Sequence, residues 1–328
     1  RPMSPSGSPG PVARSTEPAR LCRVDAGPPL PQGAADWVFA RSGRRLRAAL
    51  FAPSGAARGS VVLSPGRTEP IEKYGEVVGD LLDRRFVVLA HDWAGQGLSD
   101  RFGSDPLRGD LVGGVRLLLD DYADVLAAYG DRLPKPWIAM GHSMGGALTL
   151  AALCEGETRF EAAVLCAPMV EFLAGGLPFP LARPVIQVAG RLGFGGALAR
   201  KQLDPVDVPF EDNVLTHDRV RYERMLALLR AHPELRLGEP TWRWLRFGVE
   251  VRDRLFSPGA AERIACRVAI AGAGNDRIVS TSATRRFAAR VRGGRYVEVP
   301  NAYHEILMET DEQRGAFWRL FDELAERT

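Results

Sequence analysis

The order of apolar and polar residues along the chain predicts short strands that alternate with longer helices. Uninterrupted apolar runs of four to six residues between turn-forming residues are typical of buried strands, and apolar residues at helical spacing indicate helices. The expected strands, of which the first two form a hairpin at Ser42-Gly43, are residues 36–40, 45–52, 61–63, 86–90, 137–140, 162–166, 268–271 and 296–299. The expected helices are residues 72–84, 110–129 and 145–153.

This alternation indicates one domain of the α/β class. Strands that are apolar throughout are buried on both faces, which is typical of a mostly parallel sheet covered by helices on both sides. Between residues 170 and 255 the alternation stops, and prolines, glycines and amphipathic runs around 219–230 and 242–252 take its place. We therefore expect a core of residues 35–169 and 256–328, interrupted by a helical cap at 170–255.

The first 34 residues differ from the rest in composition. They hold eight of the 24 prolines, with glycine and serine between them. Such a segment buries too little apolar surface to offset the entropy lost on ordering. We expect an arm that is disordered or lies loosely on the surface. Neither a signal-peptide pattern nor an apolar run long enough to cross a membrane is recognised in the sequence.

Charge and cysteine content exclude several classes of function. The 43 basic and 40 acidic residues give a net charge of +3, and the arginines are scattered, so we expect no nucleic-acid partner. Cys22, Cys154, Cys166 and Cys266 are far apart and form no CxxC pair, so we expect neither a zinc site nor a disulfide framework. Free thiols favour a reducing compartment, and we expect a cytoplasmic protein without a cofactor or metal.

Ser143 is the candidate nucleophile. It is the central residue of Gly141-His142-Ser143-Met144-Gly145, a G-x-S-x-G sequence between an expected strand and an expected helix. A serine hydroxyl needs exposure and a base, and a sharp strand-to-helix turn flanked by glycines provides the exposure. The alternative is an ordinary helix start packed closely on a strand.

The base and the acid follow later in the chain. Among five histidines, His304 comes after the last strand and before the final helix, whereas His142 adjoins the serine with its side chain directed away. Asp276 ends the glycine-rich loop after strand 268–271, where a carboxylate would orient the imidazole of His304. Glu298 and Glu305 are worse placed, while a purely structural Asp276 that caps the next helix is the alternative. Backbone N–H groups of Met144 and Arg67 are expected to form the oxyanion hole.

Several motifs resemble those of bacterial lysophospholipases and monoacylglycerol lipases. Residues 64–69 with Lys73-Tyr74 look like the oxyanion loop of that group, and 91–99 look like its D-x-x-G-x-G-x-S segment. Residues 141–146 match its elbow, the strand-to-helix turn that carries the serine. In the cap, residues 213–217 and 238–241 look like the lysophospholipase branch. Pro65 replaces a histidine that many relatives carry, and Trp93 replaces their usual arginine. The resemblance spans about residues 36–325 and implies the α/β-hydrolase fold, with the triad and oxyanion roles assigned above.

The resemblance also implies an activity. We expect a serine hydrolase that cleaves carboxylic esters of lipids, a lysophospholipid or a monoacylglycerol, through an acyl-enzyme. The alternatives are an esterase for small non-lipid esters, a cofactor-free haloperoxidase or perhydrolase, and a non-catalytic ligand-binding protein on a hydrolase scaffold. Glu69 is interpreted as a brace of the oxyanion loop, and the Arg67 side chain as a candidate contact for a lipid phosphate. The cap would contact the inner membrane peripherally, and the expected pocket residues are Trp93, Phe172, Leu177 and Phe179.

Overall fold

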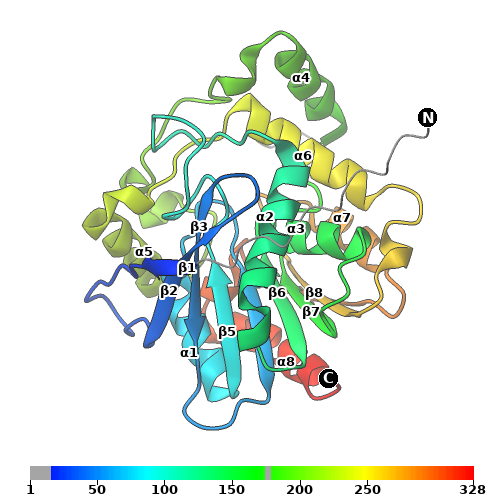
Figure 1. The fold of residues 1–328 in the computed structure, drawn as a ribbon. Helices are drawn as coiled ribbons and strands as arrows, with labels where there is room; N and C mark the ends of the chain where they lie inside the picture. The colour runs from blue at the N-terminus through cyan, green and yellow to red at the C-terminus, as the bar shows by residue number, and fades with distance from the viewer. Residues whose placement is uncertain (1–15, 174–178) are drawn as a thin grey trace, which may run out of the picture.

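The computed structural model describes residues 16–173 and 179–328, and these residues fold around a single sheet (Figure 1). Within them, nine strands lie in the order β1-β2-β3-β5-β4-β6-β7-β8-β9. The strands β1 to β3 and the β3–β5 pair are antiparallel, and the remaining pairs are parallel. Their bounds are Thr16–Ala19, Gly33–Phe39, Arg45–Phe51, Gly59–Ser64, Phe86–His91, Trp137–His142, Ala162–Cys166, Arg267–Ala273 and Arg295–Val299 for β1 to β9.

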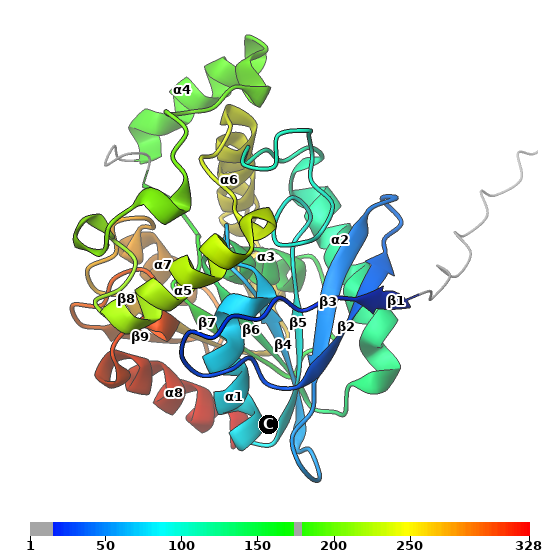
Figure 2. The ribbon, with the colours of Figure 1, turned by 90° about the vertical axis from the view of Figure 1, so that its left-hand side faces the viewer.

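Helices cover both faces of the sheet, which explains the uninterrupted apolar strands. Every residue of β4, β5, β6 and β7 is buried. Figure 2 shows α1 (Gly75–Asp83) and α8 (Asp311–Ala325) on one side of the sheet and α2 (Gly114–Tyr129) on the other. The helices α3 (Ser143–Cys154) and α7 (Thr281–Ala288) contribute to the same apolar cluster as α2. The mostly parallel α/β sheet expected from the sequence is therefore present.

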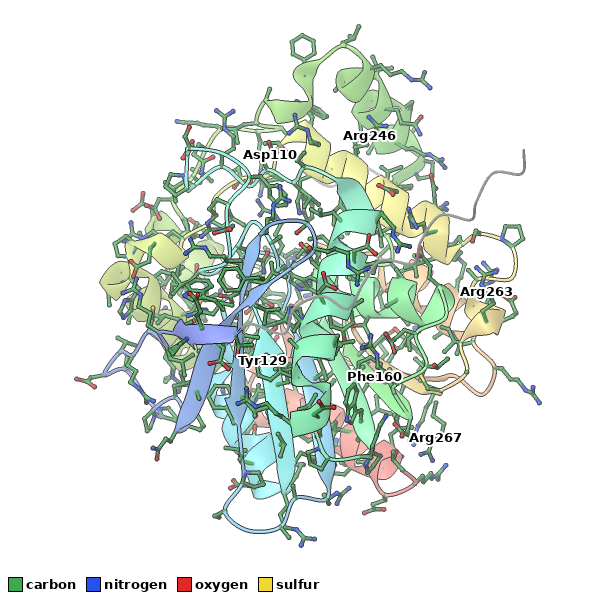
Figure 3. The ribbon with its side chains drawn as sticks, viewed as in Figure 1. Asp110, Tyr129, Phe160, Arg246, Arg263 and Arg267 are labelled. Carbon is green, nitrogen blue, oxygen red and sulfur yellow. The ribbon has the colours of Figure 1, made fainter. Side chains whose placement is uncertain are left out.

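The cap follows β7 and lies over the end of the sheet where the parallel strands terminate. Its helices are α4 (Phe179–Arg191), α5 (Arg219–Ala231) and α6 (Trp242–Leu255), and α4 projects farthest from the sheet (Figure 1). Figure 3 labels Asp110 and Arg246 in this upper part of the molecule. Asp110 accepts hydrogen bonds from Thr241 and Arg243, which ties the loop before α2 to α6.

Short 3-10 helices connect these elements. They are Ile71–Tyr74, Gly130–Arg132, Phe194–Gly196, Pro205–Asp207, Phe210–Asp212, Pro233–Leu235, Ala261–Arg263 and Ile306–Met308. No helix in the described ranges is both long enough and apolar enough to cross a lipid bilayer.

The described part of the N-terminal arm lies along the edge of the sheet. Thr16–Ala19 form β1, which pairs with the edge of β2, although the β1 side chains are mostly exposed. Cys22 is buried, and its N–H donates to the Glu72 carboxylate at 2.9 Å. The open edge of β2 offers backbone partners to the arm, and this long-range pairing orders a segment whose own composition does not.

Candidate active site

Ser143 is located in a tight turn between β6 and α3. Its φ angle is +48°, in the left-handed region that a residue with a Cβ rarely adopts. The turn fits because its neighbours are small: a Cβ on Gly145 would lie 2.2 Å from the carbonyl oxygen of Ser64, and one on Gly141 would lie 2.8 Å from Cα of Gly146. The elbow therefore packs directly against the loop after β4, which presents the serine beside that loop.

The structure brings Ser143, His304 and Asp276 together, although they lie far apart in sequence. The Ser143 Oγ is 2.9 Å from Nε2 of His304, and Nδ1 of His304 is 2.7 Å from Oδ2 of Asp276. The three side chains form one hydrogen-bonded line. In that line a serine can pass its proton to an imidazole whose other nitrogen faces a carboxylate.

Asp276 is held so that one oxygen faces the imidazole. Its Oδ1 accepts from the N–H groups of Ile278 and Val279 at 2.8 and 2.9 Å, which leaves Oδ2 for His304. Burial alone would raise the pKa of Asp276, but His304 and the two N–H groups outweigh burial and hold the pKa below its ordinary value. The residue therefore makes both the turn contacts and the contact with His304.

The loop after β4 is fixed through its backbone. The indole N–H of Trp93 donates to the carbonyl of Pro65 at 2.9 Å, and the amide of Gln96 donates to that of Gly66 at 2.7 Å. The N–H of Gly66 donates to the Glu69 carboxylate. These contacts orient the peptide units on which the N–H of Arg67 depends. Met144 is the second residue of α3, and the first N–H groups of a helix have no acceptor within it.

A buried network of charged side chains around Glu69 supports the loop after β4. Glu69 accepts from Tyr74 at 2.6 Å and from Lys73 at 2.7 Å, and Lys73 also pairs with Glu305. Glu69 further contacts His142, the residue before the nucleophile. The bracing role expected for Glu69 agrees with these contacts. The pairing of Lys73 with Glu305 is not predictable from the sequence, because no local pattern connects positions 232 residues apart.

The four pocket residues expected from the sequence have different positions. Trp93 is 2% exposed, and its ring packs against His91 and Tyr122, so it supports the loop after β4 from within the core. Phe172 and Phe179 are also buried and contact each other edge to face, with ring centroids 5.6 Å apart. Leu177 lies outside the described residues.

One group in the described ranges has ligand atoms close enough for a metal ion. Atoms of Cys22, His232 and Glu234 lie within 4.8 Å of one another, between the arm and the segment after α5. Two of these side chains already have protein partners, since Glu234 pairs with Arg20 and Nε2 of His232 lies 2.9 Å from the carbonyl of Arg23. The group includes none of the residues around Ser143, and we assign it no metal.

Comparison with curated proteins finds relatives that are named lipid hydrolases. Lysophospholipase L2 of Escherichia coli K12 is 34% identical over 272 residues, which cover 78% of this chain and 76% of the relative. Probable lysophospholipase L2 of Haemophilus influenzae is 28% identical, with 81% and 83% of the two chains covered. The monoglyceride lipase of Rattus norvegicus is 31% identical over 128 residues, which cover 39% of this chain and 41% of the lipase.

Solved structures show the same fold at low sequence identity. A soluble variant of the monoglyceride lipase of Saccharomyces cerevisiae, in complex with a substrate analog, has a TM-score of 0.69 at 16% identity. It covers 93% of this chain and 97% of its own. The monoacylglycerol lipase of Paleococcus ferrophilus has a TM-score of 0.66 at 20% identity, with 86% and 99% covered. Both likenesses establish the α/β-hydrolase architecture of this chain.

A family model also matches most of the chain. The model described as serine aminopeptidase, S33, matches residues 55–311, which include Ser143, Asp276 and His304. Because this match covers well over half of the chain, and because the lysophospholipase L2 relative covers most of it, the protein belongs to this family of hydrolases.

Proposed function

We propose that this protein hydrolyses carboxylic esters of lipids, lysophospholipids or monoacylglycerols, through an acyl-enzyme on Ser143. The observation that carries the proposal is the hydrogen-bonded line from Ser143 through His304 to Asp276. The names of the relatives support a lipid ester as the substrate, since the bacterial ones are lysophospholipases and the mammalian ones monoglyceride lipases.

The reaction proceeds in two halves. Ser143 Oγ attacks the ester carbonyl while Nε2 of His304 takes its proton, and the alcohol leaves with that proton. Water activated by His304 then attacks the acyl-enzyme and releases the fatty acid. The backbone N–H groups of Arg67 and Met144 hold the oxyanion of both intermediates, and one such donor contributes about 3 kcal/mol to lowering the barrier.

Phe172 and Phe179 are the described candidates for contact with the acyl chain. They contact each other where the core meets the cap, and Phe172 fills the space left by Gly248, where a Cβ would lie 2.7 Å from its ring. Their packing against α6 supports an apolar wall on this side of the cap.

A contact between the cap and a membrane is part of this proposal. The outer face of α4 and the turn after it present four exposed apolar side chains at helical spacing: Leu181, Val185, Val188 and, just after the helix, Leu192. Its inner face buries Phe179, Ala182 and Ile186. A helix that is apolar on both faces gains stability where its outer face enters a lipid surface, and the substrates proposed here are found in such a surface.

Labelling and hydrolysis experiments test the proposal. A fluorophosphonate probe should label the protein, and Ser143→Ala should abolish the labelling. A panel of p-nitrophenyl esters, monoacylglycerols, lysophospholipids and an aminoacyl amide should then show turnover of the lipid esters. Labelling without lipid turnover would favour a small-ester hydrolase or perhydrolase, and ligand binding without labelling would favour a binding protein. Turnover of the amide alone would favour a peptidase.

A further inference from the structure

The side chain of Arg67 is largely enclosed between the loop after β4 and the cap and has no carboxylate partner. Its Nη2 donates to the carbonyl of Gly238 at 2.6 Å, and its Cζ lies 5.0 Å from the ring centroid of Trp244. Its Nε is closed off from solvent and has no acceptor among the described residues. No acid in these ranges lies within ion-pair distance of the guanidinium, so a positive charge is buried here with one carbonyl and an aromatic face as partners.

The charges of other buried or largely buried arginines in the described ranges are compensated by carboxylates or by several carbonyl groups. Arg47 pairs with Glu72 at 2.6 Å and with Asp92 at 2.7 Å. Arg314 pairs with Glu76 and Asp80. Arg101 has no carboxylate, but its guanidinium donates to four backbone carbonyls. A buried charge is costly unless it is paired, so the exception at Arg67 indicates a donor set that is incomplete without an anion.

The surroundings of Arg67 agree with this view. Burial lowers the pKa of its guanidinium to about 10. Glu239 acts in the opposite direction without outweighing burial, and it is itself paired with Arg200. Space for the planar group is made by Gly109, where a Cβ would lie 1.9 Å from Nη2. The loop before α2, the segment before α6 and α6 itself therefore enclose the guanidinium beside the proposed oxyanion hole.

We propose that Arg67 determines specificity by pairing its guanidinium with the phosphate of a lysophospholipid, so that the enzyme prefers lysophospholipids to monoacylglycerols. This inference rests on the proposed function. The backbone N–H of Arg67 is assigned to the oxyanion, so its side chain starts at the reacting carbonyl. In a lysophospholipid the phosphate lies a few bonds from that carbonyl, within the length of one arginine side chain. A monoacylglycerol has a neutral hydroxyl at that position.

Pairing with phosphate requires only the donors that Arg67 already has. A guanidinium carries five N–H donors in a fixed plane and binds phosphate through two of them at once. Among the described residues, only Nη2 donates a hydrogen bond, and part of the residue remains accessible to solvent.

The test compares two substrates that share one acyl chain, a lysophosphatidylethanolamine and a monoacylglycerol, below their micellar concentrations. In Arg67→Gln the ratio of their kcat/KM values should fall about tenfold to a hundredfold, the usual contribution of a hydrogen bond to a charged group. Arg67→Lys should restore part of the ratio, because it keeps the charge. Arg243→Gln is the matched control, since Arg243 lies in the cap with its own acid, Asp110 at 2.8 Å, and its ratio should not change.

An unchanged ratio in Arg67→Gln would overturn the inference, even if both activities fall. Should the variant not fold, equilibrium binding to the wild-type protein decides. An alkylphosphocholine should bind at least tenfold more tightly than an alkylglycerol ether of the same chain length, and equal binding would overturn the inference. Because these ligands are not hydrolysed, the result does not depend on catalysis. Absence of turnover with both esters would count against the proposed function instead.

Discussion

His142 and Glu69 face each other inside the protein, with Nδ1 of the imidazole 3.0 Å from Oε2 of the carboxylate. The other ring nitrogen, Nε2, is 3.2 Å from the carbonyl oxygen of His304. A carbonyl oxygen only accepts, and Oε2 of Glu69 already accepts from the hydroxyl of Tyr74. Both ring nitrogens of His142 must therefore donate, so His142 is an imidazolium that joins the loop after β4 to the residue that carries the proposed base.

The charge of His142 predicts how stability depends on pH. Burial opposes the charged form, but Glu69 outweighs burial and raises the pKa of His142 above its ordinary value of 6.5. A raised pKa gives stability that is fully present below the unfolded value and is lost as the pH rises through the folded value. Urea unfolding of the wild type should therefore show a fall in the free energy of unfolding on the alkaline side.

The variant His142→Gln checks this assignment. It should be less stable than the wild type by about 3 kcal/mol near neutral pH, because the buried Glu69 keeps Lys73 but loses its charged contact with His142. The free energy of unfolding of the variant should also fall less steeply at alkaline pH than that of the wild type. Parallel stability curves for the two proteins would show that His142 is not the titrating group.

Gly145→Ala should destabilise the elbow, whereas Gly79→Ala should not. A Cβ at Gly145 would lie 2.2 and 2.4 Å from the backbone carbonyl oxygens of Ser64 and Pro65, so the elbow and the oxyanion loop would have to separate. We expect Gly145→Ala to lose about 2 kcal/mol or more of stability and most of its activity. At Gly79, in α1, a Cβ meets nothing within 4 Å, and alanine should add up to about 1 kcal/mol. Thermal unfolding and ester turnover of both variants measure the difference.

The fold and the residues of the hydrogen-bonded line at Ser143 were predictable, because each strand and each of these residues is marked by the sequence directly around it. Buried strands such as β6 are almost entirely apolar. Ser143 follows directly after β6 and Asp276 lies in the loop after β8, and the carboxyl ends of these parallel strands meet at one edge of the sheet. His304 was found by elimination, because only five histidines exist.

Features that depend on long-range contacts were not predictable. Lys73 and Glu305 each look like an ordinary charged residue until the fold buries both beside Glu69. The helix α4 was missed as an element, because Pro184 lies within it and its apolar residues fall on both faces. The arm pairs with β2 only because the folded sheet leaves that edge open.

Asp276→Asn should reduce kcat by about ten-thousandfold, the usual effect of the wrong imidazole tautomer, with little change in KM. The asparagine oxygen can still accept from the N–H groups of Ile278 and Val279, so the turn is retained. Its NH2 group then faces Nδ1 of His304 and favours the tautomer that cannot take a proton from Ser143. Steady-state kinetics with a p-nitrophenyl ester measures the effect, and circular dichroism controls for folding. A loss below tenfold would remove Asp276 from the proposed triad.

The exposed apolar residues on the outer face of α4 lead to a separate prediction about membrane binding. Leu181 and Val185 are 63% and 56% exposed, one turn apart on that face. The double variant Leu181→Glu/Val185→Glu should bind phosphatidylethanolamine–phosphatidylglycerol vesicles at least tenfold more weakly, because it replaces apolar contact with charges that the lipid does not solvate. Turnover of a water-soluble ester should be unchanged, since these side chains point away from the core.

The matched control for the membrane prediction is Val220→Glu. Val220 is 69% exposed, as much as either α4 residue, but it lies on α5, outside the apolar face of α4. If any exposed apolar side chain sufficed for vesicle binding, this variant would weaken binding as the double variant does. If the α4 face is the contact, Val220→Glu keeps wild-type affinity in vesicle sedimentation. Equal losses in both variants would therefore contradict a membrane surface located on α4, while a loss confined to Leu181→Glu/Val185→Glu would locate it there.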